Sequence, residues 1–153
     1  MSKYTCLTVV PAPQGFAATV HGLDLSAPLA PAARRELMAA WCTHAVLCFP
    51  EQNLDPTMLE HLSTYFGAFG HDPYVQPKQG FEHVIEVCRD ARETAPIFGS
   101  MWHSDWSFQA SPPSATLLYG EVVPPHGGDT VFADGYGAFE ALSPTMQALL
   151  LPL

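Results

Sequence analysis

Residues 102–108 read Trp-His-Ser-Asp-Trp-Ser-Phe, and this stretch decides how the rest of the chain is interpreted. His103 and Asp105 are two positions apart, so in an extended strand both side chains would point to the same face. An imidazole nitrogen and a carboxylate oxygen aimed at one point are two of the three ligands in the two-histidine, one-carboxylate set that holds non-haem Fe(II). A His-x-Asp pair also arises often by chance, so a surface histidine and aspartate beside an aromatic strand is the competing interpretation.

Large apolar side chains surround this polar pair. Trp102, Trp106 and Phe108 predict a dry, shaped site around it. The prolines at 112 and 113 then turn the chain, and residues 115–123 form an apolar run typical of a strand.

A glycine-rich turn and a helix follow this run. Gly127-Gly128-Asp129-Thr130 leads into a short predicted strand over 129–132, and residues 133–135 lead into a helix that contains 138–142. The order Trp-His-x-Asp, Phe, Pro-Pro, Gly-Gly-Asp-Thr and helix resembles the taurine and 2,4-dichlorophenoxyacetate dioxygenases (the TauD/TfdA family), which use Fe(II) and 2-oxoglutarate. The resemblance is strong from about Trp102 to Leu150 and traceable back to the N-terminus.

The resemblance implies a double-stranded β-helix, a jelly-roll barrel with flanking helices. Length and pattern alone indicate one domain of mixed α/β structure, mainly β, with several short strands. In the family a second histidine ligand and an arginine anchor for 2-oxoglutarate lie far downstream of Gly-Gly-Asp-Thr. After His103 the only histidine is His126, in a Pro-Gly turn, and no Lys or Arg follows Arg92. We therefore expect residues 1–153 to be the N-terminal part of one dioxygenase domain, with an incomplete barrel.

The resemblance also implies roles for single residues. His103 and Asp105 would bind the metal, and Thr130 would hydrogen-bond 2-oxoglutarate. Trp106 and Phe108 fall where relatives line the substrate pocket, although both are equally compatible with an ordinary core.

Two further positions bear on the substrate. Asp72 stands where taurine-specific relatives have a histidine, and Gly99 stands where they have a substrate-binding asparagine. An acid would repel a sulfonate, so we expect a substrate other than taurine. The alternative for Asp72 is a solvated loop without substrate contact.

The N-terminal half predicts the elements that would support this site. Strands are expected over 4–10 and 16–20, a buried strand over 45–49 and another strand over 83–87. Pro31 and Asp55-Pro56 mark the starts of two helices.

Composition limits the partners and the compartment. A formal charge of −9 argues against nucleic acid or an anionic membrane as partner. No apolar run approaches membrane-spanning length, and the N-terminus lacks a signal-peptide core. Four scattered cysteines without a CxxC pair indicate reduced thiols and a cytoplasmic protein, with zinc or disulfides as the minority option.

The function that follows is an Fe(II)- and 2-oxoglutarate-dependent dioxygenase. It would use O2 to hydroxylate a small organic substrate and release succinate and CO2, with a site completed beyond these residues. Self-association into a homo-oligomer is left open. The alternative is a non-catalytic half-domain that acts only through association with another chain.

Overall fold

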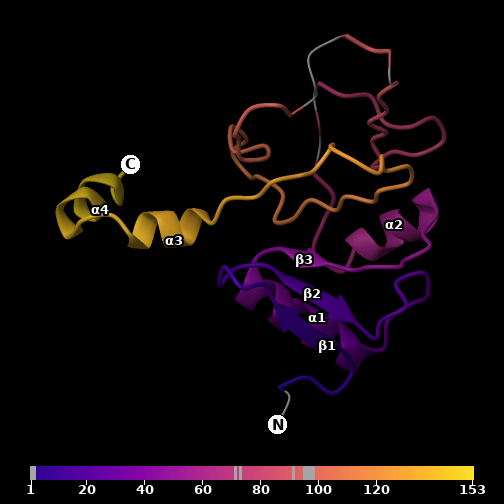
Figure 1. Ribbon diagram of the computed structural model, residues 1–153, viewed down its shortest axis with the longest axis horizontal. Coiled ribbons are helices and arrows are strands. Elements are labelled where there is room, and N and C mark those ends of the chain that lie inside the picture. The colour runs from indigo at the N-terminus through magenta and orange to yellow at the C-terminus, as the bar shows by residue number, and fades with distance from the viewer. Residues whose placement is uncertain (1–2, 71, 73, 91, 95–98) are drawn as a thin grey trace. The chain divides into compact units, whose positions relative to one another are not determined.

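The computed structural model describes residues 3–70, 72, 74–90, 92–94 and 99–153. The chain divides into two units, Met1–Tyr119 and Gly120–Leu153. The first unit contains β1 (Thr8–Pro11), β2 (Ala18–His21), α1 (Pro31–His44), β3 (Leu47–Cys48) and α2 (Pro56–Ser63) (Figure 1). The second contains α3 (Gly135–Glu140) and α4 (Pro144–Leu150).

The three strands form one sheet in the order β1-β2-β3. β1 and β2 are antiparallel, with Val9 opposite Val20, and the turn between them contains Gly15 at φ +91°, a conformation that glycine adopts without penalty. β2 and β3 are parallel, with Ala18 opposite Leu47, so α1 forms the crossover between them. The two strands expected before residue 21 are thus confirmed with shifted ends. The strand expected over 45–49 is shorter, and its two residues are not buried.

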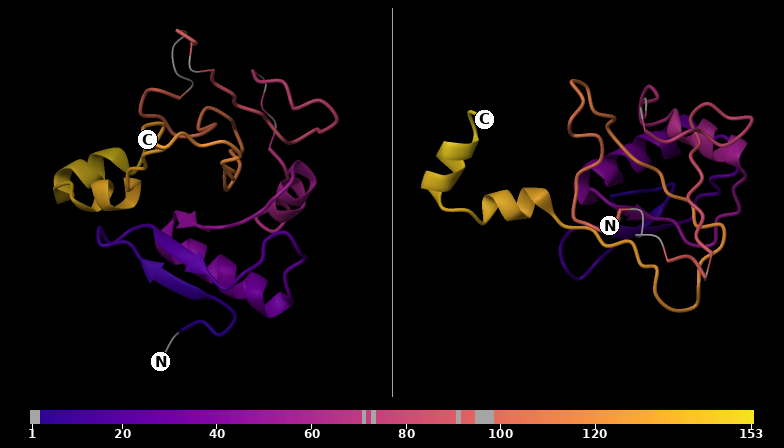
Figure 2. Two further views of the ribbon diagram at one scale, coloured as in Figure 1. Left: turned by 45° about the vertical axis from the view of Figure 1, so that its right-hand side comes forward. Right: turned by 90° about the horizontal axis from the view of Figure 1, so that it is seen from above.

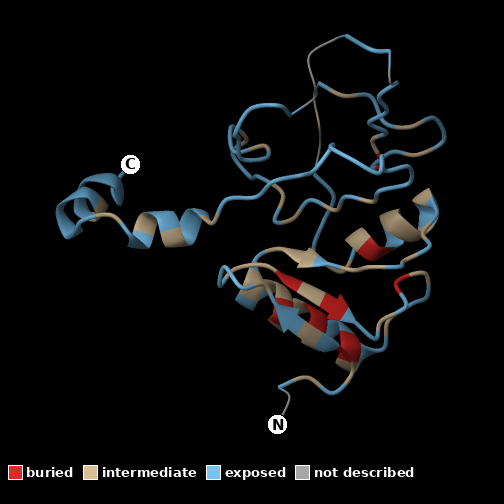
Figure 3. Ribbon diagram, in the orientation of Figure 1, coloured by how far each residue is buried: buried red, intermediate tan, exposed pale blue. Residues whose placement is uncertain are grey.

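Helix α1 supplies the core of the first unit. Pro31 occupies its first turn, as the sequence predicts, and Ala33, Leu37 and Ala40 form its buried stripe. Leu37 is fully buried and packs in one cluster with Val20 of β2 and with Leu7. Figure 2 shows α1 lying along the sheet, and Figure 3 shows that the buried residues concentrate in this layer.

A carboxylate on α1 fastens the N-terminal segment. Glu36 accepts hydrogen bonds from the hydroxyl of Thr5 at 2.6 Å and from the backbone N–H groups of Thr5 and Cys6 at 2.8–2.9 Å. The Thr5 hydroxyl, followed by these N–H groups, lowers the pKa of Glu36 below its usual 4.5. Glu36 therefore ties the chain before β1 to the helix.

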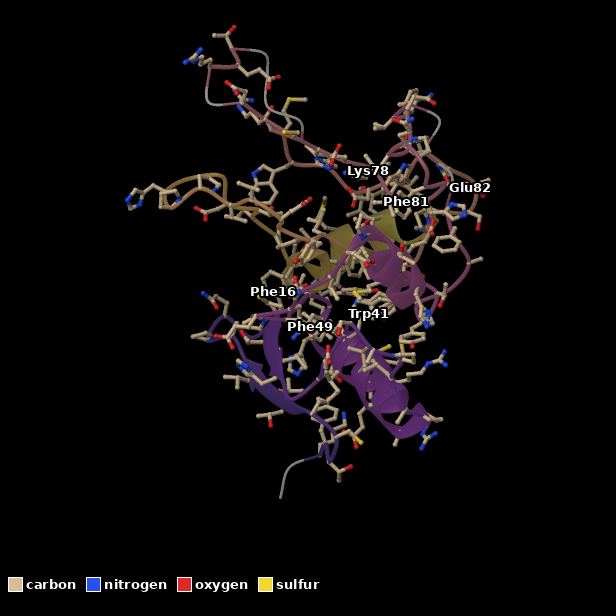
Figure 4. All side chains as sticks on the ribbon, turned by 90° about the vertical axis from the view of Figure 1, so that its right-hand side faces the viewer. Phe16, Trp41, Phe49, Lys78, Phe81 and Glu82 are labelled. Carbon is tan, nitrogen blue, oxygen red and sulfur yellow. The ribbon has the colours of Figure 1, made fainter. Side chains whose placement is uncertain are left out.

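Helix α2 begins where the sequence predicts. The Asp55 side chain accepts from the backbone N–H of Met58 at 2.8 Å and caps the helix. The helix ends at Ser63, so Phe66 lies beyond it, edge-on to Trp41 of α1 with ring centroids 5.4 Å apart. Trp41 is labelled in Figure 4, which draws the described side chains as sticks.

The second unit has no buried residue. Asp134 and Ser143 cap α3 and α4, each by accepting from a backbone N–H three residues later. The Gln147 side chain of α4 donates to the backbone carbonyls of Phe139, Glu140 and Leu142, which links the two helices. Polar contacts, not apolar burial, hold this helix pair together.

Three expected strands are wrong for this chain. Residues 83–87, 115–123 and 129–132 carry no strand, because no described segment pairs with them and a strand exists only through its ladder partner.

A mixed α/β chain is confirmed, but the mainly β character is not: the described helices have 14, 8, 6 and 7 residues and the described strands 4, 4 and 2. The jelly roll stays a prediction. In the described part, no helix has the length and apolarity to cross a membrane.

Candidate metal centre

The His-x-Asp pair lies at a turn rather than on a strand. Residues 102–104 have no regular structure, and Asp105–Phe108 form a turn in which the N–H of Gln109 donates to the carbonyl of Trp106 at 2.9 Å. Trp106 has φ +47°, in the left-handed region. The premise of an extended strand is therefore wrong. The two side chains nevertheless converge, with His103 Nε2 3.2 Å from Asp105 Oδ1.

The imidazole of His103 is oriented by the backbone. Its Nδ1 lies 2.7 Å from the carbonyl oxygen of Met101. A carbonyl can only accept a hydrogen bond, so Nδ1 carries the proton in this contact. In the neutral ring, Nε2 then holds the free lone pair, and Nε2 is the atom that faces Asp105.

The carboxylate of Asp105 is oriented by a side chain distant in sequence. Its Oδ2 accepts a hydrogen bond from the hydroxyl of Thr116 at 2.7 Å. The other oxygen, Oδ1, is the one that faces His103. Nothing in the spacing of the motif indicates Thr116, which lies 11 residues further along the chain.

This geometry fits a metal ligand pair. His103 Nε2 and Asp105 Oδ1 are 3.2 Å apart, which is close enough for both atoms to bind one cation. First-row metal ions bind nitrogen and oxygen at about 2.0–2.2 Å, so two neighbouring ligands at right angles are about 3 Å apart. A histidine whose other ring nitrogen donates to a backbone carbonyl is the usual arrangement at metal sites. One imidazole and one carboxylate suit Fe(II) or Mn(II).

The expected dry surroundings are wrong. The side chains of His103 and Asp105 are 55% and 45% exposed. Trp102 is 72% and Phe108 62% exposed, and Phe108 has an edge-on contact with Tyr74 at 5.8 Å between ring centroids. Indole and phenyl rings exclude water only when a second layer covers them, and here the rings are largely uncovered. Trp106 is half-buried. The pocket-lining roles of Trp106 and Phe108 stay predictions.

Asp72 and Gly99 have local structural roles beside their predicted ones. Asp72 Oδ1 accepts from the backbone N–H groups of Tyr74 and Val75 at 2.7 and 3.0 Å, which closes a turn in the loop. Gly99 has φ +68°, and a Cβ placed there would lie 3.5 Å from Cε1 of His103. Gly99 thus borders the imidazole of His103. Substrate contact by either residue stays a prediction.

The remaining predicted contact lies in the second unit. Thr130 is exposed and belongs to no helix or strand, so its role toward 2-oxoglutarate stays a prediction. Over the described ranges, His, Cys, Asp and Glu side chains do not gather in threes, so no third side chain of these types joins His103 and Asp105 there. A hollow of about 220 Å³ lies elsewhere, between the 25–27 loop and α2.

Comparison with known proteins places this pair in a family context. Residues 8–153 match the family described as taurine catabolism dioxygenase TauD, TfdA family. An alpha-ketoglutarate-dependent sulfonate dioxygenase of Saccharomyces cerevisiae is 32% identical over 88% of this chain and 35% of its own length. An alpha-ketoglutarate-dependent 2,4-dichlorophenoxyacetate dioxygenase of Cupriavidus pinatubonensis is 33% identical over 88% of this chain and 52% of its own length.

Solved structures to which this chain is similar also include dioxygenases. A taurine dioxygenase from Burkholderia xenovorans superposes with a TM-score of 0.81 at 29% identity, over 95% of this chain and 51% of that one. AAD-2, solved in complex with Mn(II) and N-oxalylglycine, superposes with a TM-score of 0.67 at 26% identity, over 94% and 49%. The chain spans about half the length of these structures, and 35% and 52% of the two sequence relatives.

Proposed function

The chain belongs to the taurine catabolism dioxygenase TauD, TfdA family, and from this premise we propose that it supplies the His-x-Asp part of an Fe(II)- and 2-oxoglutarate-dependent dioxygenase. The observation that carries the proposal is the convergence of His103 Nε2 and Asp105 Oδ1 to 3.2 Å, with the second polar atom of each side chain held by a separate hydrogen bond. Fe(II) specifically is inferred from this nitrogen and oxygen donor set and from the family.

The overall reaction consumes 2-oxoglutarate, O2 and a C–H bond of a small organic substrate, and yields succinate, CO2 and the hydroxylated product. When bound, the metal would activate O2 and the keto acid would supply electrons for its reduction, while the protein would provide orientation. His103 and Asp105 would hold the metal, with the Met101 carbonyl fixing the ring and the Thr116 hydroxyl fixing the carboxylate. Thr130 would donate a hydrogen bond to 2-oxoglutarate.

A working site needs more than this pair. The far carboxylate of 2-oxoglutarate requires a cation in a water-poor pocket, because an unpaired buried carboxylate costs several kcal/mol. No Lys or Arg follows Arg92 in the sequence. We propose that a further histidine and an arginine complete the site. The 2,4-dichlorophenoxyacetate dioxygenase and the taurine dioxygenase structure are each about twice as long as the stretch they share with this chain, which supports this.

The substrate is proposed to be a small molecule other than taurine. The carboxylate of Asp72 accepts hydrogen bonds from two backbone N–H groups, and a carboxylate at that position repels a sulfonate. Taurine added to a full-length protein should leave succinate release unchanged. Taurine-dependent succinate formation there would contradict this assignment.

The proposal is tested by anaerobic titration with Fe(II) and 2-oxoglutarate, followed through the visible charge-transfer band and then through succinate release. We expect weak metal binding and no coupled turnover from residues 1–153, and turnover once a relative's C-terminal half is fused. His103→Ala and Asp105→Asn should abolish that turnover. His126→Ala, in the Pro-Gly turn, is the matched control and should retain it. Equal rates from the short and fused chains, or an active Asp105→Asn variant, would refute the proposal.

A second candidate function is favoured by the exposed apolar surface of the second unit. Leu149, Leu151 and Leu153 are 63%, 74% and 98% exposed. Exposed leucines in such number are typical of an interaction surface. In this alternative, residues 1–153 act without catalysis by associating with another chain, which includes self-association. Light scattering after size-exclusion chromatography distinguishes a monomer from an assembly.

A further inference from the structure

We infer that Thr116 is a positioning residue for the proposed metal, because its hydroxyl decides which oxygen of Asp105 is presented beside His103. This inference rests on the proposed function, since it concerns the same ligand pair. It adds a residue that the His-x-Asp motif does not contain.

The two carboxylate oxygens of Asp105 are chemically equivalent until something distinguishes them. The Thr116 hydroxyl donates to Oδ2 at 2.7 Å, within the short range typical of hydrogen bonds to a charged acceptor. Oδ2 is thereby engaged, and Oδ1 faces Nε2 of His103 at 3.2 Å. Without the hydroxyl, the carboxylate can rotate about its Cβ–Cγ bond, a torsion with broad preferences.

Thr116 can position another group because its own segment is anchored on both sides. Two residues before it, the Ser114 hydroxyl donates to the carbonyl of Phe66 at 2.9 Å. Three residues after it, the Tyr119 hydroxyl accepts from the N–H of Leu54 at 3.2 Å. These bonds span 48 and 65 residues of sequence, so they fasten the segment to the body of the first unit.

The side-chain pattern of the segment turns Thr116 toward the exposed ligand pair. Ala115, Leu117 and Tyr119 are half-buried, whereas Thr116 and Leu118 are exposed. The alternation is that of an extended chain, although no ladder partner is present among the described residues. Thr116 is also branched at Cβ, which restricts χ1 and reduces the freedom of its hydroxyl.

Residues that orient a metal ligand in this way typically contribute a factor of about 10 to 100 in metal affinity. The test is binding of Mn(II) alone to residues 1–153, followed by the loss of the free Mn(II) signal in electron paramagnetic resonance. Thr116→Val keeps the shape and removes the hydroxyl, and Thr116→Ser restores it. Thr43→Val removes a threonine hydroxyl that donates to the Ala39 carbonyl on α1, and is the matched control. Asp105→Asn gives the background binding of this acidic chain.

The expected result is that Thr116→Val weakens the Asp105-dependent Mn(II) binding about 10- to 100-fold, while Thr116→Ser and Thr43→Val stay within about threefold of the parent. Thr116→Ala makes the same comparison if the valine variant loses its far-ultraviolet circular dichroism. Parent-like affinity in Thr116→Val, or a loss that Thr116→Ser does not restore, would overturn the inference and leave the ligand pair standing. Parent binding no stronger than that of Asp105→Asn would overturn the ligand pair itself, and the role of Thr116 with it.

Discussion

Replacing Leu37 by alanine tests whether one small core supports the unit that carries the two proposed metal ligands, His103 and Asp105. Leu37 is fully buried on α1 and packs with Val20 and Leu7. His103 and Asp105 belong to the same unit, Met1–Tyr119. If that unit unfolds cooperatively, a cavity at Leu37 should lower the temperature at which α1 unfolds. The contact between His103 and Asp105 should then be lost at the same lowered temperature.

The size of the effect follows from burial. A fully buried leucine truncated to alanine costs about 2–5 kcal/mol, through lost transfer free energy and the cavity left behind. The 119 residues of this unit carry an unfolding entropy of about 0.25 kcal/mol per degree, at roughly 2.1 cal/mol/K for each residue. A loss of about 3 kcal/mol should therefore lower the melting temperature by about 12 °C.

The assay is thermal unfolding followed by far-ultraviolet circular dichroism, repeated with Mn(II) binding measured at each temperature. Leu149→Ala is the matched control, because Leu149 is 63% exposed on α4 and its truncation should change the stability by no more than about 0.5 kcal/mol. We expect Mn(II) binding by Leu37→Ala to disappear at the lowered melting temperature. Equal shifts in the two variants, or Mn(II) binding that survives melting, would refute the reasoning.

Two further predictions concern the anchors of this unit. The Thr5 hydroxyl and adjacent N–H groups lower the pKa of Glu36, so Glu36 stabilises the fold fully above its unfolded pKa of 4.5 and loses this contribution as the pH falls through its lower folded pKa. Glu36→Gln should flatten the fall of melting temperature on acidification below pH 4.5, and an unchanged slope would contradict the assignment. Tyr119→Phe removes the hydroxyl that accepts from Leu54 and donates to the Gln52 carbonyl, and should cost about 1 kcal/mol in urea unfolding. No loss would show that the 115–119 segment is not fastened there.

Helix starts could be predicted from the sequence, and the metal-binding role of His103 and Asp105 stays a prediction. Pro31 and Asp55 act at the beginnings of α1 and α2 as predicted, because caps and first-turn prolines work within a few residues of themselves. The same signal, Ser143 before Pro144, also marks α4, a helix absent from the predicted elements. Family membership was likewise contained in the order of short motifs, and the match over residues 8–153 confirms it.

The tertiary structure decided which oxygen of Asp105 meets His103, and by what means. That contact depends on a turn at Asp105–Phe108 and on Thr116, whose position is set by bonds to residues 48 and 65 positions away. Strand formation likewise depended on segments distant in sequence. The 115–123 run has a strand pattern but no ladder, because helical hydrogen bonds close within four residues while a strand needs a second segment to pair with. Features set by neighbouring residues, such as helix starts, can therefore be predicted from the sequence. Contacts between distant segments are established only by the tertiary structure.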